Sequence, residues 1–283
     1  MKNDAFNQRK SEIFIIFKYL LLITMAILML YPLYFAIMSS FKPSSEYIGN
    51  VLGFPKAFFT ENYNEVLIRM NMLRFLFNTV INVSLSMIFY LVICAAAGLA
   101  FGKFNFKGKM ILFSFILFFQ IFPQMVVAQE LYLILARINL LNTRLGMVLA
   151  WCAYFTPFGT YIMTTYFSTV PKEIIESTKI DGANVFQLLF KVMMPIAKPM
   201  LGTIGIIGTL SMWNELPFAS MILMDNKLRT VTVGIATMQG QYGVPVPILA
   251  SAVIISAIIP TIAYFVFQRF IAMGATAGTL SAQ

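Results

Sequence analysis

The sequence predicts an all-α, polytopic membrane protein with about six transmembrane helices. Of its 283 residues, 59% are hydrophobic and only 11% are charged, whereas soluble domains carry about 25% charged residues. The mean hydropathy is +0.82. The apolar residues form long unbroken runs rich in Leu, Ile, Phe and Met, unlike the short alternating strands of a membrane barrel. Runs of about 20 apolar residues are the length that a spanning helix needs.

Six runs of this kind predict six spans within a single transmembrane domain that covers the whole chain. They lie at about 14–38, 75–100, 110–128, 145–167, 200–224 and 248–270. The first run follows basic residues, as in a signal peptide, but it is much longer than a signal core. We therefore expect an uncleaved signal anchor.

The placement of basic residues predicts the orientation of these spans. With the N-terminus inside, twelve of the 20 Lys and Arg residues fall on the inner side, including the cluster Lys103, Lys107 and Lys109. Both termini and the connecting segment 170–199 are then cytoplasmic. The net charge of +9 comes from residues that flank the apolar runs, which indicates contact with anionic lipid headgroups and not with nucleic acid.

The composition also limits the chemistry that this chain can perform. It contains no histidine, which removes histidine metal sites and histidine-based catalytic triads. It lacks clustered carboxylates, and no G-x-x-x-x-G-K-[ST] phosphate loop occurs. We therefore predict no catalytic residue, no metal site and no cofactor bound by this chain.

The segment 170–199 is more regular and more charged than a plain connector between two spans. Pro171 suits the first turn of a helix, where its missing N–H costs nothing. Gly182 permits a turn, and Asp181 is expected to cap the next helix. The second helix is expected to end at Pro195 and Pro199. The sequence therefore predicts two short helices joined by a tight elbow.

The second short helix of the segment 170–199 has an apolar face that needs a packing partner. The face is formed by Phe186, Leu189, Phe190 and Met193. One interpretation is an interfacial helix that rests on lipid. The other is a helix that fits a groove on a soluble subunit. An elbow held by Gly and Pro favours the second, because a rigid elbow can transmit force.

The residues of this elbow carry a family resemblance. The run ESTKIDGA at 176–183, followed by Pro195, resembles the EAA coupling loop of bacterial ABC importer permeases. That family usually has two alanines after the glutamate, where this chain has Ser177 and Thr178. Both substitutes are small, so close packing is expected to be kept.

The rest of the chain resembles carbohydrate permeases of the maltose and multiple-sugar type. The tail departs from that group after Gly278, because it lacks the usual basic ending. The matching motifs are Leu30–Leu33, Ser39–Lys42, Glu61–Tyr63, Phe77–Thr79, Trp213–Glu215 and Gly274–Gly278.

The resemblance implies the type I ABC importer permease fold in a bacterial inner membrane. It implies four kinds of partner: a second homologous permease, an ATPase dimer, an extracytoplasmic sugar-binding protein and membrane lipid. ATP and Mg would be bound by the ATPase. The implied ATPase-coupling residues are Glu176, Asp181, Gly182, Ala183, Phe186 and Pro195.

Polar residues within the spans are candidates for the substrate pathway, because such groups are costly there and usually functional. Trp213, Asn214 and Glu215 could offer a sugar an aromatic face and hydrogen-bonding groups. The alternative places Glu215 at the outer end, paired with Arg137, Arg144 or Arg229.

Two asparagines on one face of the second span are further candidates. Asn78 and Asn82 are four residues apart, so they share a helix face and could line a sugar path. Interhelical hydrogen bonding is the alternative for both.

Two other classes of function are weighed against an importer subunit. A stand-alone secondary transporter or channel would carry membrane-embedded ionisable residues and often internal repeats. Glu215 is the one candidate for such a residue, and no repeat is visible. A membrane enzyme is disfavoured by the lack of histidine and of clustered carboxylates.

Overall fold

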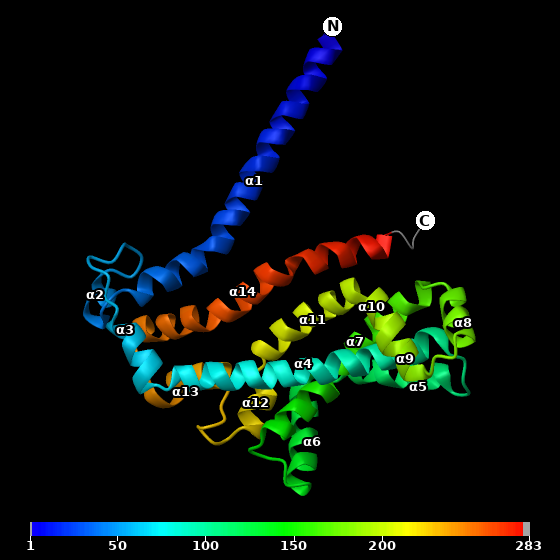
Figure 1. Cartoon of the computed structure of the whole chain (residues 1–283). Helices are drawn as coiled ribbons and strands as arrows, with labels where there is room; N and C mark the ends of the chain where they lie inside the picture. Colours follow the sequence, from blue (N-terminus) through cyan, green and yellow to red (C-terminus); the bar gives the residue numbers. More distant parts are fainter. Residues whose placement is uncertain (1, 280–283) are drawn as a thin grey trace. The chain divides into compact units, whose positions relative to one another are not determined.

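A computed structural model describes residues 2–279, with side chains described for 14–239 and 243–268. All regular elements in this part of the chain are helices (Figure 1). The atypical end of the tail, at 280–283, lies outside the described residues. The chain divides into two compact units, Met1–Met70 with Met238–Ile255 and Asn71–Thr237 with Ser256–Gln283. That both units belong to one permease domain stays a prediction.

The helices confirm an all-α, polytopic membrane protein. Four helices of the described chain are long and apolar enough to cross a membrane. Two further pairs of helices also meet this test of length and composition, but each pair is bent, at 109–137 and 185–213. Within the described residues the number of spans is therefore four, or up to six if each bent pair counts as one. The four continuous spans are Phe14–Ser40, Met72–Lys103, Arg144–Thr169 and Val246–Gln268.

The first unit begins with a long apolar helix, α1 (Lys2–Ser40). Its described side chains are exposed from Phe14 to Leu33, and none of the span window is buried against this chain. An apolar surface of this length needs lipid or another protein against it. The unit continues with α2 (Ser44–Gly49), α3 (Glu61–Asn64) and the π-helix η1 (Glu65–Arg69), and it includes the start of α14 (Val246–Thr279).

Buried polar side chains hold the loop that follows α1. Lys42 is fully buried, and its Nζ donates to the carbonyls of Asn50 at 2.7 Å and Val51 at 3.1 Å. The Asn62 amide donates to the carbonyls of Ser40 at 2.9 Å and Lys42 at 2.8 Å. Buried donors need such acceptors. The motifs Ser39–Lys42 and Glu61–Tyr63 therefore fix each other within this unit.

The second unit is built around the pair α4 (Met72–Lys103) and α7 (Arg144–Thr169). Glycines allow these helices to approach closely. A Cβ at Gly98 would lie 2.5 Å from the Met163 Cβ, and one at Gly159 would lie 2.4 Å from the Cys94 Sγ. Around the pair lie α5 (Lys109–Phe118), α6 (Gln124–Arg137), α8 (Lys172–Ile180), α11 (Lys198–Trp213), α12 (Pro217–Ile222) and the first turns of α13 (Val231–Tyr242).

The third predicted span, at 110–128, is not one continuous helix. Helix α5 ends in a 3₁₀ turn, η2 (Phe119–Ile121), and α6 leaves at an angle of 108°. Pro123 causes this break, because it lacks an N–H and forces Phe122 into an extended conformation.

The fifth predicted span, at 200–224, is also interrupted. Helix α11 ends at Trp213, and α12 begins at Pro217 after a non-helical turn. Pro217 occupies the first helical position, where a missing N–H is tolerated. Helix α13, which follows, was not expected from the apolar runs, because its sequence at 231–242 is shorter than a span.

Gly98→Ala is expected to lower the melting temperature of the purified protein. The added Cβ would meet Met163 backbone at 2.9 Å as well as its Cβ, and overpacking costs typically about 1–3 kcal/mol. Gly205→Ala is the control, because its Cβ would meet nothing closer than 3.9 Å and alanine favours a helix. Thermal unfolding in detergent compares the two variants, and equal losses would contradict close packing at Gly98.

Lys42→Met is expected to loosen the loop at 43–60, because two backbone carbonyls lose their buried donor. Lys56→Met is the matched control, since Lys56 is exposed in the same loop. Limited proteolysis measures the effect, with faster cleavage of the loop only in Lys42→Met. Identical cleavage of both variants would mean that the Lys42 ammonium does not hold the loop.

Candidate functional site

The elbow of the 170–199 segment is a Schellman turn at the end of α8. The N–H of Gly182 donates to the Lys179 carbonyl at 3.0 Å, and the N–H of Ala183 donates to the Thr178 carbonyl at 3.2 Å. This pair of bonds defines the motif. Gly182 has a φ of 78°, a left-handed conformation that glycine adopts without steric cost.

The cap of the second short helix is Asn184, so the expectation that Asp181 caps it is wrong. Asn184 accepts from the Gln187 N–H, and the Gln187 side chain accepts from the Asn184 N–H, both at 2.9 Å. Asp181 instead follows Ile180, the last residue of α8, as the C-cap of that helix. The left-handed turn at Gly182 places the C-cap Asp181 and the N-cap Asn184 three positions apart. Asn184 followed three residues later by Gln187 is a capping-box pattern that the sequence already contains.

The predicted apolar face of the second helix is divided. Leu189 and Met193 are buried, whereas Phe186 and Phe190 are 74% and 48% exposed. The reason is the π-helix η3 (Leu188–Met193), whose wider turn shifts the register that an α-helix would keep. Short α-helical turns flank it, α9 (Val185–Gln187) and α10 (Met194–Ile196).

The elbow therefore presents an exposed surface of mixed character, called here the elbow surface. Ile180 is 86% exposed and Val185 is 59% exposed. Large apolar side chains at such exposure, beside carboxylates, are typical of a protein-binding site. The elbow surface consists of Glu176, Ile180, Asp181, Val185 and Phe186, all exposed. Pro195 is also exposed but lies in α10, before the bend of 82° into α11.

Contacts with the ends of α4 and α7 hold this segment in place (Figure 1). The Lys103 ammonium donates to the carbonyls of Ser168, at 3.0 Å, and Val170. A cation suits the carbonyl end of a helix. The Tyr166 hydroxyl donates to the Ile196 carbonyl at 3.0 Å. The elbow is thus mounted on the main helix pair at both of its ends.

Glu215 is buried, and four hydrogen bonds hold its carboxyl group. Oε1 accepts from Gln124 Nε2 at 3.0 Å and from the Phe218 N–H at 2.7 Å. Oε2 accepts from Trp151 Nε1 at 3.0 Å and from the Ala219 N–H at 3.1 Å. Among the described ion pairs Glu215 has no arginine partner, so the alternative that paired it with an arginine is wrong. Glu215 instead closes the break between α11 and α12.

Asn78 joins three segments of the second unit. Its Nδ2 donates to the carbonyls of Lys227 at 2.9 Å and Arg229 at 3.0 Å. Its Oδ1 accepts from Arg144 Nη2 at 2.7 Å, and Asn82 Oδ1 accepts from Arg144 Nη1 at 3.3 Å. Both asparagines are buried. Their geometry is the interhelical hydrogen bonding that was the alternative to a substrate path.

The other two pathway candidates, Trp213 and Asn214, also have hydrogen bonds within the chain. Trp213 is buried, and its carbonyl accepts from the Thr232 hydroxyl at 2.8 Å. Asn214 is exposed, and its side chain donates to the Leu210 carbonyl at 2.8 Å. That they line a substrate path stays a prediction.

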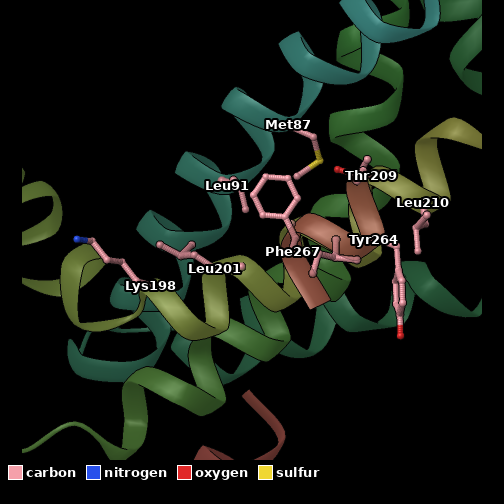
Figure 2. A pocket seen from close by; sticks show the side chains of 12 residues that line it. Met87, Leu91, Lys198, Leu201, Thr209, Leu210, Tyr264 and Phe267 are labelled. Atoms are coloured by element: carbon pink, nitrogen blue, oxygen red, sulfur yellow. The ribbon is translucent and has the colours of Figure 1, made fainter. Parts of the chain in front are cut away.

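A largely apolar cavity of about 390 Å³ lies among α4, α11 and the later part of α14. Gly202 and Gly205 form part of its floor. Figure 2 shows Phe267 beside Leu91 and Met87, with Lys198 pointing away at the far end. Gly205 thus opens onto a hollow, whereas a Cβ at Gly208 would lie 3.1 Å from the Tyr90 ring. Such a hollow suits an acyl chain or a neighbouring helix.

Residues 92–274, which include the elbow, both broken spans and Glu215, match the family described as binding-protein-dependent transport system inner membrane components. The chain belongs to this family. The match covers well over half of the chain.

Named relatives of this permease match over nearly their whole length. The trehalose/maltose transport system permease protein MalG of Thermococcus litoralis is 31% identical over 264 residues, 92% of this chain and 95% of the relative. The diacetylchitobiose uptake system permease protein NgcG of Streptomyces coelicolor is 28% identical over 261 residues, 92% of this chain and 86% of the relative.

Solved structures share the fold of the permease. A chain of a bacterial ABC transporter involved in the import of the acidic polysaccharide alginate matches with a TM-score of 0.79 and 24% identity. The match covers 92% of this chain and 97% of that chain. The type I ABC importer permease fold predicted from the sequence is therefore confirmed.

Glu215→Ala is expected to lower the melting temperature of the permease strongly. The Trp151 indole N–H and two amides would lose their acceptor, and each buried donor left unpaired costs roughly 1–3 kcal/mol. Glu215→Gln should also destabilise, because its NH₂ group would face another donor. Asn214→Ala, at the exposed neighbour, is the control for thermal unfolding. A Glu215→Ala variant as stable as Asn214→Ala would contradict the capping role.

Proposed function

We propose that this permease is the membrane subunit of an ATP-driven, binding-protein-dependent importer for a carbohydrate. The family match and the named relatives, which carry trehalose, maltose or diacetylchitobiose in their names, support this. The chain supplies half of the translocation pathway, and an ATPase dimer binds ATP and Mg. The bacterial inner membrane is its location, with both termini and the elbow on the side of the ATPase.

The elbow surface is the proposed contact with the ATPase. Its exposed apolar side chains are the main observation that supports the proposed function. Ile180 and Phe186 are more than 70% exposed on a segment that buried residues hold firmly. Glu176 and Asp181 add charge next to these anchors, and Gly182 and Ala183 shape the turn between them. A rigid helix end that fits a groove can transmit a displacement of the ATPase to α7 and α11.

Other exposed surfaces of the permease suit its other proposed partners. The apolar helix α1 and the cavity beside Gly205 need lipid or a second homologous permease as cover. The extracytoplasmic sugar-binding protein would approach from the side opposite the elbow. Pro195 is proposed to set the angle at which the coupling segment enters α11.

No observation favours a stand-alone transporter. Such a protein needs a membrane-embedded ionisable group that can exchange an ion. Glu215 was the candidate, and four hydrogen bonds within the chain occupy its carboxyl oxygens. This leaves it poorly suited to release and rebind a cation during transport.

Ile180→Asp and Phe186→Asp are expected to weaken binding of the ATPase by about 30-fold or more, the loss typical of an interface hot spot. Ile48→Asp is the matched control, because Ile48 is 82% exposed on α2 and is not part of the elbow surface. Co-purification of the ATPase with the tagged permease from native membranes measures the effect. Retention of the ATPase by both elbow variants would falsify the coupling role.

A further inference from the structure

A second cavity of the permease, of about 310 Å³, lies among α4, the turn η2, α7 and α11. This volume is at the lower end of the range of ligand pockets, roughly 300–1,000 Å³. All of its lining belongs to the second unit. The residues that matter here are Tyr90, Gln120, Tyr154, Phe155, Phe158 and Ser211.

The lining combines aromatic rings with uncharged polar groups. Within the described part of the chain the Tyr154 hydroxyl, the Gln120 amide and the Ser211 hydroxyl have no hydrogen-bond partner, and no Lys, Arg, Asp or Glu lines this cavity. A polar group within a membrane protein is costly unless it is paired. These three groups are therefore available to a polar, uncharged ligand.

The depth of the cavity along its helices corresponds to about the middle of a membrane. Tyr90, Gln120, Tyr154 and Ser211 are each about 11 to 15 residues from the helix ends at 103, 109, 169 and 198, which face the coupling segment. At 1.5 Å per residue this is about 16–23 Å, and half of the hydrocarbon core is about 15 Å. Secondary transporters hold their substrates near the midplane, and we expect the same depth here.

Close approaches to two glycines fix the position of Tyr90 in the wall of this cavity. A Cβ at Gly159 would lie 2.5 Å from the Tyr90 hydroxyl oxygen, and a Cβ at Gly208 would lie 3.1 Å from its ring. Tyr90 is thereby fixed between α7 and α11.

We infer that this cavity binds one ring of a neutral sugar during its passage, an inference that rests on the proposed function. Aromatic rings pack against the apolar face of a pyranose, and the amide and hydroxyl groups bond to its hydroxyls. An acidic sugar would need a cation in the lining to offset its charge. The candidate residues Asn78 and Glu215 then support the framework and do not touch sugar.

The test uses the whole complex, purified through this permease and reconstituted in liposomes with its binding protein. The probes are labelled trehalose, maltose and diacetylchitobiose as neutral sugars, and an alginate trisaccharide as an acidic one. Ser211→Trp, which fills the cavity, is expected to reduce neutral uptake more than tenfold. Gln120→Ala is expected to raise KM two- to tenfold, the factor for about one hydrogen bond.

Ser220→Trp is the matched control, because Ser220 is exposed on α12 and does not line the cavity. Assembly and ATPase activity show that each variant is folded. Neutral uptake that is equal in Ser211→Trp and Ser220→Trp overturns the cavity assignment alone. Import of the alginate trisaccharide without import of any neutral sugar also overturns the cavity assignment, but it leaves the proposed function of a carbohydrate importer standing. If the unaltered complex imports none of the four sugars, both the cavity assignment and the proposed function are overturned.

Discussion

Close packing of α4 against α7 is the contact on which the rest of the second unit depends. Gly98 and Gly159 bring the two backbones together, because a side chain at either position would overlap the facing helix. At one end of the pair, Lys103 of α4 donates to two carbonyls at the C-terminal end of α7, those of Ser168 and Val170. Toward the other end, Arg144 of α7 bonds to Asn78 and Asn82 of α4. The elbow and the proposed sugar cavity are both positioned by this one pair.

The breaks in the membrane helices follow from the need to satisfy backbone groups away from water. A span that stops inside a bilayer exposes amides and carbonyls that lipid cannot bond. Glu215 resolves this at the break between α11 and α12, where it accepts from two amides of the new helix. Gln124, just after the Pro123 break, donates to the same carboxyl group. The two interrupted spans are thus joined through one side chain.

This arrangement connects the proposed coupling surface to the proposed cavity. Helix α11 leaves the coupling segment at 82° and contributes Ser211 to the cavity lining. Helix α7 ends at the coupling segment and contributes Tyr154. A displacement of the elbow would move both walls of the cavity relative to α4. Packed helices of this kind shift as rigid bodies and do not deform gradually.

The sequence by itself determined the features that depend on neighbouring residues. Apolar runs identified the continuous spans, and the Asp-Gly step with its flanking prolines identified the elbow. These are local properties of the chain, since helix length, turn chemistry and capping act over a few residues. Even here the π-helix at Leu188–Met193 divided a face that regular spacing had predicted to be continuous.

Only the tertiary structure decided what the polar residues do. An arginine partner was one alternative for Glu215, which instead bonds to Trp151, 64 positions earlier in the chain. Asn78 bonds to carbonyls about 150 positions away. The cavity gathers Gln120, Tyr154 and Ser211 from three separate helical segments. Hydrogen-bond partners are selected by how helices pack, and helical periodicity, which repeats every 3.6 residues, carries no information about that selection.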